Sequence, residues 1–210
     1  MYIPDHFAAG TGAVHDLLSK PGAANLVTMT AKGLLATLLP FTYEPAIGKH
    51  GALHAHLARN NTQWLEPAIG ESLAIIQGPD AYISPFWYAS KAEHGRVVPT
   101  WNHATAHVYG RLVLHDDPVW LRSHVRALTA LHEAGAEHPW SVEDAPDRFI
   151  AGQLRAIVGV ELVITRIEAK AKPSQNRPDG DIAGVVDGLR CAGETDMAAA
   201  VEHASQSCPR

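Results

Sequence analysis

Residues 25–41 read Asn-Leu-Val-Thr-Met-Thr-Ala-Lys-Gly-Leu-Leu-Ala-Thr-Leu-Leu-Pro-Phe, and they contain two apolar runs separated by Lys32-Gly33. The first run alternates and contains β-branched residues, which is typical of a strand, and Lys-Gly suits a tight turn. The stretch therefore predicts a β-hairpin formed by residues 25–31 and 34–41.

Further extended segments follow along the chain. Residues 107–115 alternate between apolar and polar positions with a period of two, which indicates a half-buried strand. Residues 157–167 are largely apolar and rich in Val and Ile, which is typical of a central strand. Shorter strands are predicted at 53–57 and at 72–77, where Gly78-Pro79-Asp80 is expected to end the strand before 81–84 continues extended.

Helices are predicted between these strands. Asp117-Pro118 is an N-cap followed by proline at the first helical position, and Asp144-Ala145-Pro146 begins a second helix. Shorter helices are expected at 14–21 and 181–190. Many short strands with a few helices favour a mainly β fold, a small closed β-barrel with peripheral helices.

The composition excludes several classes of protein. The 210 residues contain 17 Lys and Arg against 22 Asp and Glu, a net charge of −5 that argues against direct DNA binding. No apolar stretch approaches the ~20 residues of a membrane span, and no signal sequence is visible, so we expect a cytoplasmic protein. We expect one domain over 1–190 and a loosely ordered tail over 191–210, in which Cys191 and Cys208 are reduced thiols.

Three segments carry more polar side chains than a core requires. In the first, His54 and His56 share one face of a predicted strand, and Arg59 and Asn60 follow where that strand ends. Such donors suit an anion such as phosphate, although a solvated strand end that caps a helix explains the same residues.

The second segment, 82–103, interleaves aromatic residues with Ser, Lys, Arg, Thr and Asn side chains. Aromatic rings beside fixed donors suit a planar phosphorylated cofactor, and an aromatic packing corner is the alternative. The third segment, 170–178, concentrates cations and amides after an apolar strand. It could close over a ligand or form a solvated basic loop.

These segments resemble the PaiB family, described as FMN-binding negative transcriptional regulators. The resemblance covers about residues 1–190, and it depends on several motifs together. The matching motifs include Met1-Tyr2-Ile3-Pro4, His56-Leu57-Ala58-Arg59, Gln77-Gly78-Pro79, Val97-Val98-Pro99-Thr100-Trp101-Asn102, His107-Val108-Tyr109-Gly110 and Ser174-Gln175-Asn176-Arg177.

The family is similar to the pyridoxamine-phosphate-oxidase-like proteins. The resemblance therefore implies a six-stranded antiparallel split β-barrel, a homodimer, and FMN at the subunit interface. It implies a flavin-dependent oxidoreductase or a metabolite-responsive negative regulator. The residues that it implies for cofactor binding are His56, Arg59, Asn60, Lys91, Thr100, Trp101, Asn102, Gln175, Asn176 and Arg177.

Haem is the alternative cofactor, because some PaiB-like proteins resemble haem-dependent enzymes such as piperazate synthases. An axial histidine in an apolar pocket would bind the iron. His56 is the first candidate, followed by His54 and His103. The helical histidines His15, His124 and His132, and His115 at the end of a strand, are expected to be surface or satisfied side chains.

Overall fold

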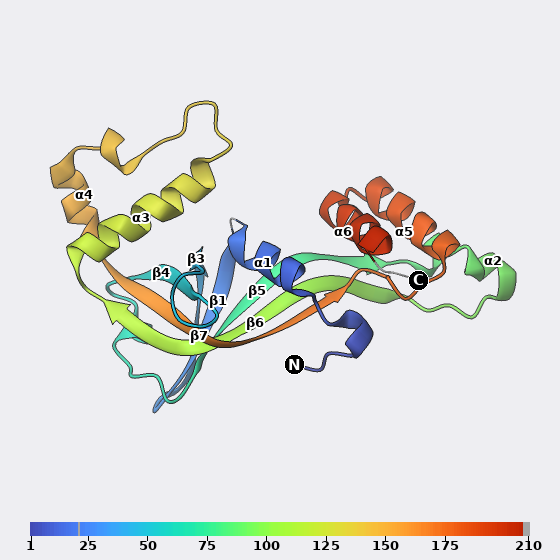
Figure 1. The fold of residues 1–210 in the computed structure, drawn as a ribbon, viewed down its shortest axis with the longest axis horizontal. Coiled ribbons are helices and arrows are strands. Elements are labelled where there is room, and N and C mark those ends of the chain that lie inside the picture. The colour runs from blue at the N-terminus through green and yellow to red at the C-terminus, as the bar shows by residue number, and fades with distance from the viewer. Residues whose placement is uncertain (21, 208–210) are drawn as a thin grey trace. The chain divides into compact units, whose positions relative to one another are not determined.

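The structure, a computed structural model, describes residues 1–20 and 22–207 (Figure 1). The chain divides into two compact units. The first unit comprises Met1–Val14, Gln77–Ala106 and the chain from Ala169 onward, and the second comprises His15–Ile76 and His107–Glu168. The expected single domain over 1–190 stays a prediction.

The described residues form one seven-stranded sheet with the order β2-β1-β5-β6-β7-β4-β3. β1 pairs antiparallel with β2 and β5, and β4 pairs antiparallel with β3 and β7. The sheet has one strand more than the six predicted. The additional strand, β3, has only three residues, which is too short to show an alternating pattern in the sequence. The strands are β1 (Ala23–Thr30), β2 (Gly33–Pro40), β3 (Thr42–Glu44), β4 (Ala52–Ala58), β5 (Ser72–Ile83), β6 (Thr100–His115) and β7 (Ile157–Lys172).

The predicted hairpin is confirmed as β1 and β2, with Thr30 opposite Gly33 in the register. Gly33 has a backbone φ of 109°, which residues other than glycine rarely adopt. The Thr30 hydroxyl also donates to the Gly33 carbonyl at 2.9 Å. The turn is therefore stabilised by its own residues.

The predicted end of β5 at Gly78-Pro79-Asp80 is wrong, since the strand continues to Ile83. Ala81 and Ile83 alternate into the core of the first unit, where they are 3% and 0% exposed. Their burial outweighs the turn preference of Gly and Pro, which is a local tendency of the backbone. β6 and β7 also extend beyond their predicted ranges.

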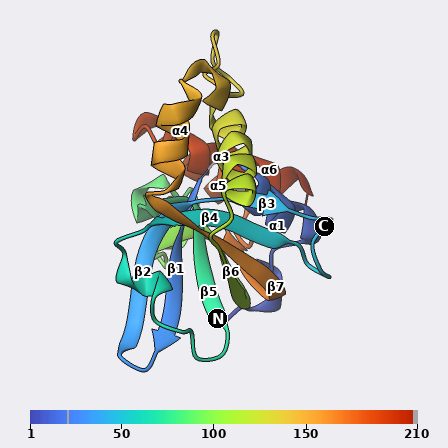
Figure 2. The ribbon, with the colours of Figure 1, turned by 90° about the vertical axis from the view of Figure 1, so that its left-hand side faces the viewer.

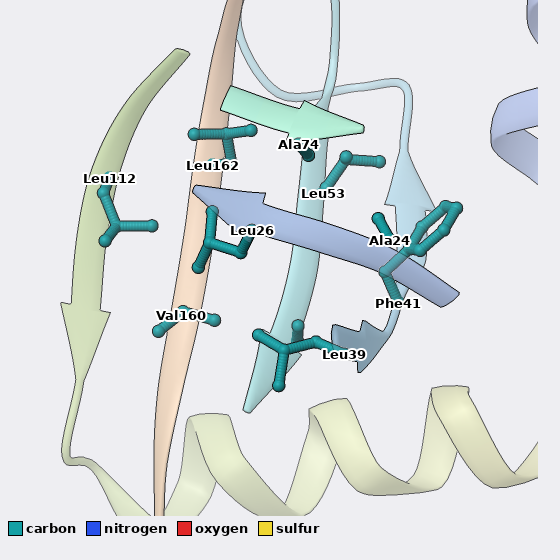
Figure 3. Close-up of a pocket in the computed structure, with 10 residues that line it drawn as sticks. Ala24, Leu26, Leu39, Phe41, Leu53, Ala74, Leu112, Val160 and Leu162 are labelled. Carbon is teal, nitrogen blue, oxygen red and sulfur yellow. The ribbon is translucent and has the colours of Figure 1, made fainter. Parts of the chain in front are cut away.

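The core of the second unit encloses a small apolar cavity of about 20 Å³ (Figure 3). Leu26, Leu39, Leu53 and Leu162 are among the aliphatic side chains that surround it. Pockets for organic ligands are typically ~300–1,000 Å³ and contain placed polar groups. This cavity is too small and too apolar to hold a flavin.

Figure 2 shows helices α3 and α4 side by side in the second unit. The predicted N-cap of α3 is confirmed, because the Asp117 carboxylate accepts from the N–H groups of Val119 and Trp120, each at 3.2 Å. The helices are α1 (Thr11–Ser19), α2 (Ser90–His94), α3 (Pro118–Glu133), α4 (Asp147–Leu154), α5 (Asp179–Cys191) and α6 (Thr195–Ser207).

The tail that was expected to be loose forms α6 over Thr195–Ser207 instead. Met197 and Val201 are buried in one cluster with Val185 and Leu189 of α5. Small apolar residues at helical spacing therefore dock α6 on α5. Cys191 is an exposed free thiol, whereas Cys208 and Pro21 lie outside the described residues.

No helix among residues 1–20 and 22–207 is long and apolar enough to cross a membrane. The expected cytoplasmic location stays a prediction.

Candidate functional site

The residues predicted to bind a cofactor lie in both units. Each group is held by contacts within its own unit. The second unit contains His54, His56, Arg59 and Asn60. The first unit contains Lys91, Thr100, Trp101, Asn102, His103, Gln175, Asn176 and Arg177.

A group of imidazoles in the second unit surrounds one indole and one carboxylate; we call it the histidine cluster. His54 and His56 alternate along β4 and so share a face, as predicted. α3 contributes further members to the same group. The histidine cluster consists of His54, His56, His115, Trp120, His124 and Glu161.

Two sets of hydrogen bonds connect the histidine cluster. Nδ1 of His56 lies 3.0 Å from Nε2 of His124. The Glu161 carboxylate lies between two imidazoles, 3.4 Å from Nε2 of His54 and 2.7 Å from Nε2 of His115. One set therefore joins β4 to α3, and the other joins β4, β6 and β7.

Trp120 packs among the imidazoles. Its ring stacks on His115 with centroids 4.1 Å apart and on His124 with centroids 5.4 Å apart. Gly159 on β7, which pairs with His56, makes room for this indole. A Cβ at position 159 would lie 2.2 Å from the Trp120 ring, so only glycine permits this packing.

Burial keeps the central imidazoles neutral. His124 is 3% exposed, and burial lowers its pKa to about 3, with the neighbouring His56 and His54 adding to the effect. Burial also lowers the pKa of His56. Both rings are therefore uncharged near neutral pH.

His124 was expected to be a surface or satisfied side chain, and its place in the histidine cluster was not predicted. His124 lies on the same helical face as Leu121 and Leu128, at spacings of three and four residues, and all three are buried. That spacing is the signal that could have found it. Among the described residues, no group of three or more His, Cys, Asp or Glu side chains is arranged to hold a metal ion.

Arg59 is fixed where β4 ends. Its guanidinium donates to the Asp116 carboxylate, to the Arg155 carbonyl at 2.7 Å and to the Ile157 carbonyl at 2.9 Å. It lines an open groove of about 720 Å³ that α3 and α4 border. Asn60 is exposed beside it.

The other arginines of this groove mostly have carboxylate partners. Arg122 donates to Asp147 at 3.2 Å, and Arg126 donates to Glu143 at 2.6 Å. The positive charge of the groove is thus largely neutralised by the chain itself.

The first unit gathers three cations, Lys170, Lys172 and Arg177; we call them the cation cluster. Lys172 donates to the Thr100 hydroxyl and to the Trp101 carbonyl, the latter at 3.3 Å. Burial lowers the pKa of Lys172, and repulsion from Lys170 and Arg177 lowers it further. None of the three cations forms an ion pair within the described part of the chain.

Exposed aromatic rings lie in the same unit. Trp101 is 53% exposed and Tyr82 is 50% exposed, and their ring centroids lie 6.4 Å apart. Trp101 donates from Nε1 to Asp80 at 3.2 Å. Burial and the nearby Lys170 lower the pKa of His103, and Lys91 places its Nζ 4.4 Å from the Phe86 ring centroid.

Asn102 is 0% exposed, and its amide donates to the Ser174 hydroxyl at 2.9 Å. Ser174 has a φ of 61°, which is uncommon outside glycine, so this bond holds a strained turn. Asn102 was predicted to bind the cofactor. Its contacts show that it connects β6 to the loop that follows β7.

The loop after β7 contains the remaining predicted residues. The Gln175 side chain donates to the His6 carbonyl at 3.0 Å and to the Ala171 carbonyl at 2.9 Å. Its Oε1 is buried without a hydrogen-bond partner in the described chain. Arg177 stacks 4.6 Å above the Tyr88 ring, and Asn176 is exposed.

The first unit therefore offers cations without carboxylate partners, exposed aromatic rings and, in Oε1 of Gln175, a buried acceptor without a partner in the described chain. A planar anion with an N–H group would satisfy all three. FMN has a phosphate, a flat ring system and a ring N–H, so the donor set of this unit fits it.

Comparison with known proteins is consistent with this chemistry. A family model described as "Putative FMN-binding domain" matches residues 1–166. The chain is also 28% identical over 193 residues to "Protease synthase and sporulation protein PAI 2" of Bacillus subtilis, an alignment that covers 90% of this chain and 89% of that protein.

Solved structures show the same fold at low sequence identity. A conserved hypothetical protein of Mycobacterium tuberculosis matches with a TM-score of 0.56 and 11% identity, over 85% of this chain and 94% of that one. The FAD and Heme binding protein of Mycobacterium smegmatis matches with a TM-score of 0.54 and 17% identity, over 85% and 80% of the two chains. The chain therefore belongs to the family of FMN-binding domains, and both the PaiB resemblance and the split-barrel fold class are confirmed.

Proposed function

We propose that this protein binds FMN and acts as a small flavin-dependent oxidoreductase. The observation that carries the proposal is the cation cluster, in which Lys170, Lys172 and Arg177 lie near one another and none has a carboxylate partner among the described residues. A bound phosphate would relieve the repulsion among them. The Thr100 hydroxyl beside Lys172 supplies a further polar group.

The remaining side chains of the first unit would orient the flavin ring. Trp101 and Tyr82 offer exposed aromatic faces for stacking, and Oε1 of Gln175 is an acceptor for a ring N–H. Asn102 would act indirectly, because its bond to Ser174 positions the loop that contains Gln175. The flavin itself would supply hydride or electron transfer, and these residues would bind and orient it.

The oligomeric state belongs to the same proposal. The PaiB resemblance implies a homodimer with the flavin at the subunit interface, where Arg59 and Asn60 would contribute. Size-exclusion chromatography with light scattering should give twice the mass of the 22.6 kDa chain. A monomer that binds FMN at full affinity would contradict the interface site.

Binding is tested by titrating the purified protein with FMN and, separately, with riboflavin, which lacks the phosphate. We expect the flavin absorbance and fluorescence to change at micromolar FMN, and riboflavin to bind more weakly. Failure of FMN to bind at these concentrations would refute the proposal. Equal affinity for FMN and riboflavin would show that the cation cluster does not bind the phosphate.

The regulator function is the weaker alternative, because the chain has a net charge of −5. Non-specific electrostatic contacts to DNA weaken steeply as salt increases. A gel-shift with the upstream region of its own operon at ~150 mM salt would test it, and we expect no shift.

Haem binding is the second candidate, and the PaiB resemblance supplies the reason to test it. In the histidine cluster, His56 is held through Nδ1, and its Nε2 makes no hydrogen bond in the described chain. An iron ligand is often held in this way through its other ring nitrogen. A Soret band on adding haemin that disappears in a His56→Ala variant would support haem.

A further inference from the structure

The imidazole pair formed by His56 and His124 determines which ligand chemistry His56 can offer. Nδ1 of His56 and Nε2 of His124 lie 3.0 Å apart, which is an ordinary hydrogen-bond distance. His124 is buried and His56 is half-buried, and above pH 6.5 an ordinary imidazole is neutral and carries one N–H. One of the two facing nitrogens must therefore donate and the other must accept.

The two possible arrangements differ in what they leave at the other nitrogen of His124. If His56 donates, the hydrogen of His124 must lie on Nδ1. If His124 donates from Nε2, its Nδ1 carries only a lone pair. Nδ1 of His124 is buried and has no hydrogen-bond partner in the described chain.

The surroundings of His124 favour the second arrangement. Its ring is 3% exposed and stacks against Trp120 at an interplanar angle of 21°, so the ring face meets an indole surface. A buried N–H without an acceptor is rarer in native proteins than an acceptor that lacks a donor, and an unmade hydrogen bond costs about 1–3 kcal/mol. The hydrogen of His124 therefore lies on Nε2.

We infer that His124 is a positioning residue that donates from Nε2 to Nδ1 of His56, so that His56 presents an N–H donor at Nε2. That donor suits an oxygen acceptor of the ligand, such as a phosphate or a flavin carbonyl. It does not suit haem iron, which requires a lone pair on Nε2. The inference rests on the proposed flavin function and deepens it, since His56 is among the residues that the PaiB resemblance implies for cofactor binding.

The tautomers can be read directly by NMR on the ligand-free protein labelled with ¹⁵N. At a pH well above 6.5, long-range ¹H–¹⁵N spectra distinguish a ring nitrogen that carries hydrogen from one that does not, and a His56→Gln variant assigns the His56 signals. We expect His56 to carry hydrogen on Nε2 and none on Nδ1. Hydrogen on Nδ1 of His56 would overturn the inference.

Two variants of His124 sharpen the experiment. His124→Gln keeps an N–H donor toward His56 and should preserve its tautomer. His124→Glu, at a pH where its carboxyl is ionised, offers only oxygen acceptors, so it should move the hydrogen of His56 to Nδ1 and free Nε2 for haemin. His132→Gln, an exposed position on the same helix, should change neither signal. If His124→Glu does not fold, the spectrum of the unaltered protein still decides.

The failure of this inference can be told apart from failure of the proposed function. The tautomer is measured without flavin, whereas FMN binding is measured by titration. A protein that shows the expected tautomer but binds no FMN keeps the inference and refutes the function. A protein that binds FMN with hydrogen on Nδ1 of His56 does the reverse.

Discussion

The histidine cluster of the second unit and the cation cluster of the first unit handle their polar groups in opposite ways. In the histidine cluster, burial keeps His56 and His124 neutral, and Glu161 bonds His54 and His115. In the cation cluster, Lys172 repels Lys170 and Arg177 without any carboxylate partner among the described residues. The histidine cluster is neutral and bonded mostly within the fold, with Nδ1 of His124 and Nε2 of His56 left over, whereas the cation cluster keeps its charge without a carboxylate partner in the described chain and is suited to an anionic ligand.

The largest expected effect comes from breaking the packing of the histidine cluster at Gly159. In a Gly159→Val variant the new side chain would collide with Trp120, whose ring lies 2.2 Å from the position of a Cβ. Overpacking of this kind costs ~1–3 kcal/mol, and displacement of α3 adds to it, so we expect a loss of about 3 kcal/mol. Urea unfolding measures the change.

The matched control for that variant is Gly152→Ala on α4. A Cβ there would meet nothing closer than the Arg155 guanidinium at 3.9 Å. Because alanine favours helix over glycine, the control should unfold at the same or higher urea concentration. If Gly159→Val and the unaltered protein are equally stable, Trp120 does not pack against Gly159 as described.

The second effect concerns Asp181, a buried carboxylate of the first unit that is bonded to Ser90 and not to the cation cluster. Asp181 is 1% exposed, and it accepts from the Ser90 N–H at 2.9 Å and the Ser90 hydroxyl at 2.8 Å. Asp181→Ala would leave both donors buried and unpaired, at a cost of about 2 kcal/mol in unfolding free energy. Asp187→Ala, exposed on the same helix, should cost little.

The third effect is a pH dependence of stability to which His124 of the histidine cluster contributes. The pKa of His124 is about 3 in the folded protein against 6.5 for an ordinary histidine, so in this window the unfolded chain binds a proton that the folded one does not. The free energy of unfolding should therefore fall by about 1.4 kcal/mol per pH unit as the pH decreases below 6.5.

This contribution is isolated by comparing variants across the same pH series. His124→Gln should lack it, and His132→Gln should retain it. Identical slopes in the unaltered protein and His124→Gln would show that His124 is not buried as a neutral ring.

The smallest effect sharpens the ligand side of the comparison. Lys172→Met removes the central cation, and FMN should bind about tenfold more weakly, since a charge-assisted bond to phosphate is lost. Riboflavin affinity should stay unchanged. Lys49→Met, at an exposed position in the second unit, should alter neither affinity.

Much of the fold follows from local patterns in the sequence. The alternation of residues 25–31 and the Lys32-Gly33 turn predict β1 and β2, and Asp117-Pro118 predicts the start of α3. β3, α6 and the continuation of β5 past Pro79 do not follow from local patterns, because long-range packing stabilises them against or without a local preference.

The candidate site was predictable in composition but not in arrangement. Aromatic rings beside polar donors mark residues 82–103, and cations and amides mark residues 170–178. The structure places Thr100 and Trp101 against Lys172. The partnership of His56 with His124 is invisible in sequence, since 68 positions separate the two residues and only the docking of α3 on β4 joins them. The bond between Asn102 and Ser174 is likewise invisible in sequence, since 72 positions separate the two residues.

The stacking of Trp120 has a spectroscopic consequence. Five tryptophans contribute to the emission of this protein, and Trp120 is the one that stacks on His115 and His124. A charged imidazole quenches a stacked indole more strongly than a neutral one does. The emission of Trp120 therefore reports the protonation of His124, and the difference between the spectra of the unaltered protein and a Trp120→Phe variant isolates that signal without any added label.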